Sequence, residues 1–121
     1  MPAPIVFFDI AGPDSHQLGE FYSSMFDWDI GADGSLTTPV VSPSVTVPSL
    51  MGTIRQDPAE KMIYVGVDDI TATLAKVEAN GGSVDQPRFE VPGVVVLGLF
   101  RDPAGNRIGL VEMLDGQAKV P

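Results

Sequence analysis

MIYVGVDDITATLAKVEANGG, residues 62–82, is the stretch of sequence that decides the fold. Its first six residues are rich in β-branched and apolar side chains, which is typical of a strand. Asp69 then offers a helix N-cap, apolar residues recur at helical spacing, and an Asn-Gly-Gly run marks the end of the helix. The apolar stripe consists of Ile70, Leu74 and Val77. The stretch therefore predicts a strand over residues 62–67 followed by an amphipathic helix.

The same pattern occurs once before, near the start of the chain. IVFFDI, residues 5–10, has the composition of a strand, and Asp14 is a good N-cap for a following helix. The apolar stripe of that helix consists of Leu18, Phe21, Tyr22 and Met25. Superposing Asp14 on Asp69 gives an offset of 69 − 14 = 55 residues, which indicates a duplicated module.

Three extended segments are predicted after each helix, so that the chain has the pattern βαβββ twice. The first set is residues 27–30, 35–41 and 45–54, and the second is residues 83–85, 94–100 and 107–113. Asp33-Gly34 predicts a type I′ hairpin turn between the first two segments. We therefore expect one α+β domain with a first module over residues 1–58, a second over 59–114, and a frayed tail over 115–121.

The composition excludes several kinds of site. The chain has 121 residues, no cysteine and a single histidine, His16, which rules out thiolate metal sites, disulfides and a multi-histidine metal cage. Seven basic and 16 acidic residues give a formal charge of −9, and the basic residues form no patch. Binding to the phosphate backbone of a nucleic acid is therefore not expected.

The hydropathy pattern argues against a membrane protein. No stretch approaches the roughly 18 to 20 consecutive apolar residues of a membrane span. The first residues, Met-Pro-Ala-Pro-Ile, lack the charged start and apolar core of a signal peptide. We expect a cytoplasmic protein without membrane partners.

Four stretches carry a resemblance to a known family. They are IVFFDI, the helix with Phe21-Tyr22 and Phe26-Asp27-Trp28, YVGVDDITATLAKVEANGG, and LFRDPAGNRIGLVE. Together they resemble a single domain of the vicinal oxygen chelate superfamily, which includes glyoxalase I, bleomycin resistance proteins, fosfomycin resistance proteins and extradiol dioxygenases. The resemblance implies that two βαβββ modules form a curled mixed sheet, a cup with the helices on its outer face. In that family the cup binds a divalent metal and a small molecule.

The metal positions implied by the resemblance carry no metal-binding side chains. The histidine position of the first strand falls on Phe7, its counterpart 55 residues later on Met62, and the glutamate position near the end on Gly109. A catalytic metal needs three or more nitrogen or carboxylate ligands in fixed geometry. We therefore predict no metal and no cofactor at the usual site, while the fourth position, near residues 52–54, is not assigned. Glu112 has the opposite strand parity to Gly109 and is expected on the helix side or the rim.

Strand alternation predicts which side chains face into the cup. They are Ile5, Phe7, Asp9, Met62, Tyr64, Gly66, Arg107, Gly109, Val111 and Met113. Such a face is apolar with a few polar points, as in small-molecule pockets. The glycines at 66 and 109 are expected to leave room there, although the same residues would also suit a filled barrel core.

The polar candidates each have two interpretations. Asp9, Tyr64 and Arg107 either orient a polar ligand or move a proton, or Asp9 and Arg107 form a structural salt bridge with Tyr64 packed at the rim. Trp28 is either a packing anchor or an aromatic wall for a planar ligand. His16, in the first turn of its helix and opposite the apolar stripe, is expected to be exposed to solvent.

The predicted function is binding of a small organic molecule without a metal. The predicted ligand-binding residues are Phe7, Asp9, Trp28, Met62, Tyr64, Arg107, Gly109 and Met113. Resemblance to the bleomycin resistance branch implies a homodimer that sequesters its ligand, and the negative charge favours a cationic one. One alternative is a glyoxalase-like lyase, isomerase or hydrolase, either metal-free or using metal ligands not identified in the sequence. Another is a structural or interaction protein with a filled cup.

Overall fold

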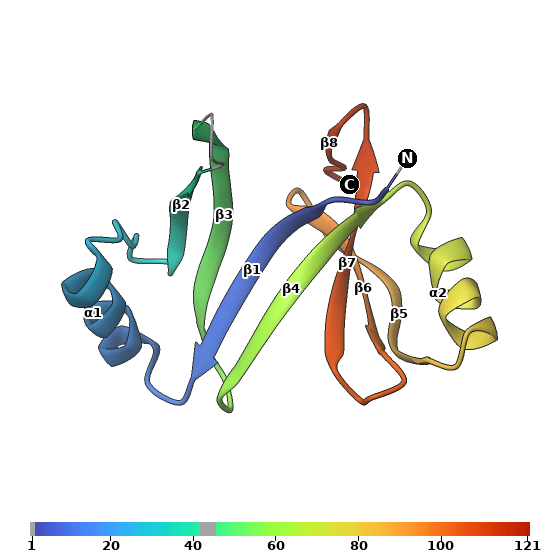
Figure 1. Cartoon of the computed structure of the whole chain (residues 1–121), viewed down its shortest axis with the longest axis horizontal. Helices are drawn as coiled ribbons and strands as arrows, with labels where there is room; N and C mark the ends of the chain where they lie inside the picture. Colours follow the sequence, from blue (N-terminus) through green and yellow to red (C-terminus); the bar gives the residue numbers. More distant parts are fainter. Residues whose placement is uncertain (1, 42–45) are drawn as a thin grey trace. The chain divides into compact units, whose positions relative to one another are not determined.

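The computed structural model describes residues 2–41 and 46–121, which form ten helices and strands (Figure 1). In chain order they are β1 (Ile5–Gly12), α1 (Ser15–Phe26), β2 (Ser35–Val41), β3 (Thr46–Gln56), β4 (Glu60–Val67), α2 (Ile70–Ala79), β5 (Ser83–Val91), β6 (Val95–Arg101), β7 (Arg107–Leu114) and β8 (Gln117–Ala118). They divide into an N-terminal unit, Phe7–Met62, and a C-terminal unit, Ile63–Pro121 together with the residues before Phe7. No helix in the described part of the chain is long and apolar enough to cross a membrane.

The C-terminal unit is a sheet covered by α2. Its strand order is β4-β7-β6-β5, with β4 parallel to β7 and the other neighbours antiparallel. Asp69 caps α2 by accepting a hydrogen bond from the backbone N–H of Ala72 at 2.9 Å, as predicted. Ile70 and Leu74 of α2 are buried against Val96 and Leu110 of the sheet and form the centre of the core.

The N-terminal unit repeats this arrangement with one strand fewer. Its order is β2-β3-β1, and β1 runs parallel to β3 as β4 runs parallel to β7. Asp14 caps α1 through the backbone N–H of Gln17 at 3.0 Å. The α+β fold and the two helix caps predicted from the sequence are therefore confirmed.

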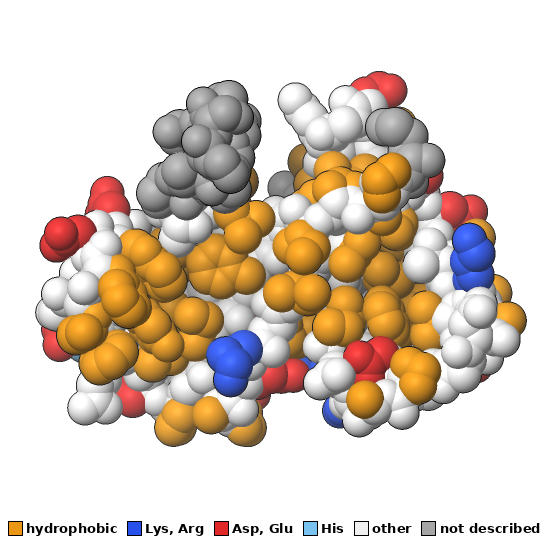
Figure 2. Space-filling model, in the orientation of Figure 1, with side chains coloured by type: hydrophobic (Ala, Val, Ile, Leu, Met, Phe, Trp, Pro, Cys, Tyr) orange, Lys and Arg blue, Asp and Glu red, His pale blue; other side chains and the backbone are white. Residues whose placement is uncertain are grey.

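Helix α1 packs less closely than predicted. None of its residues is fully buried; Leu18 and Tyr22 are half-buried, whereas Phe21 and Met25 are more than half exposed. Figure 2 shows the resulting group of hydrophobic side chains over α1.

The predicted strand over residues 27–30 is wrong, because that segment is held against the end of α1. Asp27 adopts a left-handed conformation with φ of 57° at the helix end, and the Ser23 hydroxyl donates to the carbonyl oxygen of Trp28 at 2.9 Å. The predicted type I′ turn at Asp33-Gly34 is also wrong, since of the two only Gly34 has a positive φ. Segment 35–41 matches β2, and 45–54 overlaps β3, with Val45 outside the described residues.

The C-terminal tail is not frayed, which corrects the prediction for residues 115–121. Asp115 and Gly116 both have positive φ, 53° and 78°, and make a tight turn that returns β8 along β7. The backbone N–H of Lys119 then donates to the carbonyl oxygen of Glu112 at 2.8 Å, and the carbonyl oxygen of Pro121 accepts from Gly93. The tail therefore belongs to the folded C-terminal unit.

Glu112 connects three parts of the C-terminal unit. Its side chain lies on the helix side, as predicted, and accepts a hydrogen bond from the backbone N–H of Ile70 at 3.2 Å. Arg88 of β5 donates to both carboxylate oxygens, and the Lys119 ammonium lies 3.5 Å from one of them. The hydrogen bonds from Arg88 outweigh the effect of burial, and the pKa of Glu112 falls from 4.5 to about 2.

We predict that Glu112→Gln destabilises the protein in a pH-dependent way. A carboxylate whose pKa is lowered by folding stabilises the protein above its unfolded-state pKa, and this contribution is lost as the pH falls toward the folded-state value. The free energy of unfolding should fall by about 3 kcal/mol near neutral pH, with a difference that shrinks below pH 4.5. Chemical denaturation of both proteins at several pH values measures this difference. Glu78→Gln, on the exposed side of α2, should change stability by less than about 0.5 kcal/mol, and a Glu112→Gln effect independent of pH would contradict the prediction.

Candidate functional site

The predicted ligand-binding residues fall in both units. Phe7, Asp9, Trp28 and Met62 belong to the N-terminal unit, whereas Tyr64, Arg107, Gly109 and Met113 belong to the C-terminal unit. Within each unit, the strand register shows which of these side chains share a face.

One face of the N-terminal sheet carries a shallow hollow. Phe7 pairs with Met51, and Asp9 pairs with Thr53, so these four side chains alternate onto the same face. The hollow beside them has a volume of about 370 Å³. Its lining consists of Phe7, Asp29, Gly31, Ser35, Leu36, Thr37, Met51, Gly52 and Thr53. Apolar surface with a few hydroxyl groups and one carboxylate is the usual composition of a small-molecule site.

Arg55 holds Asp9 at the end of this face. Asp9 is only 2% exposed, and its carboxylate lies 3.2 Å from Nε of Arg55. The same guanidinium contacts Asp57 at 2.6 Å and Glu60 at 2.5 Å. Burial lowers the pKa of Arg55, but hydrogen bonds and charge from Glu60 and Asp9 raise it by more, so the guanidinium stays charged. Met62 is also buried, and its sulfur lies 3.8 Å from a guanidinium nitrogen of Arg55.

Trp28 lies on the other side of β1. Its ring contacts that of Phe8, with centroids 6.2 Å apart, and Phe8 alternates with Phe7 and Asp9. Trp28 also stacks on Tyr22 of α1 at 5.4 Å and 13°. The structure thus places Trp28 as a packing anchor for α1, and it does not bring Trp28 onto the face of Phe7.

In the C-terminal unit, neighbouring side chains fill the space beside two glycines. Tyr64 pairs with Gly109, and a Cβ atom at Gly109 would lie 2.2 Å from the Tyr64 ring. A Cβ atom at Gly66 would lie 2.9 Å from Cγ of Met113. The expectation that these glycines leave room for a ligand is therefore wrong, because a large side chain on the adjacent strand lies over each of them.

The remaining polar candidates have partners within their own units. Arg107 donates from Nε to Asp85 at 3.0 Å. The predicted pair between Asp9 and Arg107 would join the two units and stays a prediction. His16 is exposed, as predicted, and its Nε2 lies 3.0 Å from a carboxylate oxygen of Glu20.

The residues at the family's metal positions do not fit a metal. Phe7 and Met62 offer no nitrogen or carboxylate ligand, and Gly109 has no side chain. Among residues 2–41 and 46–121, no group of three or more His, Cys, Asp or Glu side chains is arranged to hold a metal ion.

Comparison with known proteins assigns the family. A family model described as a glyoxalase-like domain matches residues 5–111. The chain belongs to the glyoxalase-like domain family. This confirms the resemblance to the vicinal oxygen chelate superfamily.

Two curated relatives are similar in sequence. The anthracycline biosynthesis protein DnrV of Streptomyces peucetius is 29% identical over 123 residues, which cover 86% of this chain and 45% of the relative. The putative glyoxylase CFP32 of Mycobacterium bovis is 26% identical over 111 residues, covering 84% of this chain and 42% of the relative. The chain thus spans less than half the length of these relatives.

The solved structures show the fold. A methylmalonyl-CoA epimerase in complex with methylmalonyl-CoA is 15% identical, with a TM-score of 0.65, and the match covers 98% of this chain and 100% of the epimerase. A hypothetical protein from Bacillus halodurans is 13% identical, with a TM-score of 0.61, and the match covers 98% of this chain and 99% of that protein.

We predict that Gly109→Ala destabilises the protein because its methyl group would overlap the Tyr64 ring. The expected loss is about 1–3 kcal/mol in the free energy of unfolding, measured by denaturant titration. In a Tyr64→Ala background the same change should cost less than about 0.5 kcal/mol, because the ring is gone. An equal cost in both backgrounds would show that the glycine is needed for another reason.

Proposed function

We propose that the protein binds a small organic molecule on the face of the N-terminal sheet that carries Phe7, without a metal. The observation that carries this proposal is the hollow beside Phe7 and Met51. Met51 is 57% exposed on a strand whose neighbours on the same face are Thr53 and Arg55. A large apolar side chain left open beside hydroxyl groups and the carboxylate of Asp29 suits an organic ligand with a polar end.

Binding without a metal is supported by the side chains themselves. The three positions where the family holds its metal contain Phe7, Met62 and Gly109. In the C-terminal unit the ring of Tyr64 takes the space of the third ligand. Such residues provide apolar contact area instead of coordination.

The charge and the family suggest the kind of ligand and assembly. The net charge of −9 favours capture of a cationic molecule, because long-range attraction raises the rate of encounter. We also propose that the protein is a homodimer, as the resemblance to the bleomycin resistance branch implies, and that it is located in the cytoplasm. The name of the relative DnrV links that protein to the biosynthesis of anthracyclines, so these are suitable first probes.

A thermal-shift screen tests the proposal. Cationic antibiotics, anthracyclines and thiol conjugates are added to the purified protein, and a ligand that binds the folded state should raise its melting temperature by at least about 3 °C. Met51→Lys should remove the shift, because a positive charge in the hollow repels a cationic ligand. Met25→Lys is the matched control, since Met25 is equally exposed on α1 and outside the hollow. A shift that survives Met51→Lys would place the ligand elsewhere.

Elemental analysis tests the absence of a metal requirement. Protein purified without a chelator should contain less than about 0.1 equivalents of zinc, nickel, iron or manganese. A stoichiometric amount of any of these metals would contradict the proposal.

An enzymatic function is the second candidate. Asp9 is buried beside Arg55, and the relative CFP32 is called a putative glyoxylase. A buried carboxylate next to a guanidinium is able to position or move a proton of a bound molecule. A time course by NMR of a ligand found in the screen distinguishes the two, because a lyase or isomerase converts the ligand and a sequestering protein leaves it unchanged.

A further inference from the structure

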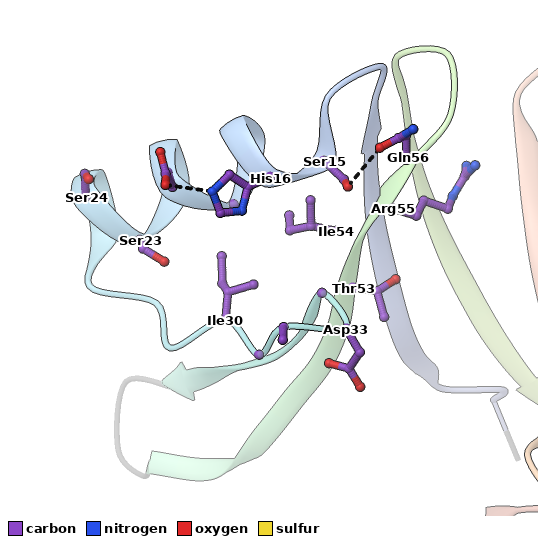
Figure 3. A pocket seen from close by; sticks show the side chains of 15 residues that line it. Ser15, His16, Ser23, Ser24, Ile30, Asp33, Thr53, Ile54, Arg55 and Gln56 are labelled. Carbon is purple, nitrogen blue, oxygen red and sulfur yellow. Dashed lines mark hydrogen bonds and ion pairs between the residues drawn. The ribbon is translucent and has the colours of Figure 1, made fainter.

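A second hollow lies between α1 and the segment that leads into β2, within the N-terminal unit (Figure 3). Its volume is about 830 Å³, within the range of ligand pockets. The lining comes from three places: residues 15–24 of α1, residues 30–34 before β2, and residues 53–56 at the end of β3. Except for Gly31 and Thr53, these residues differ from those that line the hollow beside Phe7.

The hollow exists because the facing side chains are small. Ser15, Gly19 and Ser23 follow one another at intervals of four along α1 and therefore lie on one side of the helix. A Cβ atom at Gly19 would touch only Ile30, at 3.8 Å. A Cβ atom at position 19 would therefore be accommodated without strain, in ordinary van der Waals contact with Ile30.

The lining combines an apolar surface with groups that accept hydrogen bonds. Ile30 and Ile54 point into the space between α1 and residues 30–34, and Ser23 points toward it from the helix, whereas the Ser15 hydroxyl is turned to Gln56 and His16 to Glu20. The Ser23 hydroxyl donates to the carbonyl oxygen of Trp28, so its remaining capacity is to accept. A ligand with several hydroxyl or ammonium donors and a carbon ring matches such a lining.

The charges around the hollow favour a cation. Glu20 and Asp33 line it, and hydrogen bonds from Ser35 lower the pKa of Asp33, which keeps that carboxylate ionised. Arg55 is the one arginine or lysine of the lining, and its guanidinium contacts three carboxylates of the N-terminal unit. Those contacts already balance the positive charge of Arg55, so Glu20 and Asp33 set the sign of the remaining charge in the lining.

We propose that the hollow between α1 and residues 30–34 is a binding site for a small hydroxylated amine, such as an amino sugar. Its ring packs on Ile30 and Ile54, its hydroxyl groups donate to the serines, and its ammonium group lies near Glu20. The site is separate from the one proposed above, because its lining comes mainly from α1 and residues 30–34, and only Gly31 and Thr53 line both hollows.

Titration with glucosamine, followed by ¹H–¹⁵N NMR, tests the site. Backbone amides of residues 15–24 and 30–34 should shift, with saturation at about 10 mM or below. Glucose and N-acetylglucosamine, which lack the ammonium group, should bind at least about fivefold more weakly.

Two variants test the location. Gly19→Leu should fill the hollow and displace the sugar ring. Binding of glucosamine should then weaken at least tenfold, which corresponds to ~1.4 kcal/mol of binding free energy. Glu20→Gln should weaken it about fivefold, whereas Glu78→Gln, which removes the same charge from α2, should change it less than twofold. Amide shifts outside the hollow, unchanged binding in both variants, or equal binding of glucose would each overturn the proposal. Glu20→Gln keeps the test decisive if Gly19→Leu alters the fold.

Discussion

The buried carboxylate of Glu112 organises the C-terminal unit. It accepts hydrogen bonds from the first residue of α2 and from Arg88 of β5, and it pairs with Lys119 of the tail. A carboxylate that is 6% exposed is stable only when its charge and lone pairs are matched, and four donor groups supply that match. This one side chain therefore ties both the start of α2 and the tail after β7 to the sheet.

Asp9 has a corresponding role in the N-terminal unit. It is the more deeply buried of the two acidic side chains, and Arg55 supplies its positive partner from β3. The two units therefore use the same physical solution, a buried carboxylate with an arginine from another strand. They differ in packing, because α2 buries Ile70 and Leu74 whereas α1 buries none of its residues. The looser packing of α1 leaves the hollow in which we place a second ligand.

Local signals in the sequence predicted the fold well. Asp14 and Asp69 cap their helices as expected, and strand parity placed Glu112 on the helix side. The Asp-Gly pair occurs twice, and a tight turn between strands formed at Asp115-Gly116, where both residues have positive φ and a frayed tail had been predicted. It did not form at Asp33-Gly34, because the segment before it is held at the end of α1.

The site was harder to predict because it depends on contacts between distant residues. Arg55 becomes the partner of Asp9 only when β1 and β3 pair in parallel, and no local pattern reveals that register. The space beside Gly109 is likewise decided by Tyr64, 45 residues earlier, on the neighbouring strand. The sequence therefore indicated which residues have no metal-binding group, and the structure showed which side chains occupy the space instead.

We propose that an organic ligand binds beside Phe7 and Met51 without a metal. Isothermal titration of the best ligand from the screen, with and without an excess of chelator, tests it most directly. We predict dissociation constants that agree within about twofold, because no bond to a metal contributes to the binding free energy. Loss of binding in the chelator, with recovery after addition of zinc or manganese, would contradict the claim.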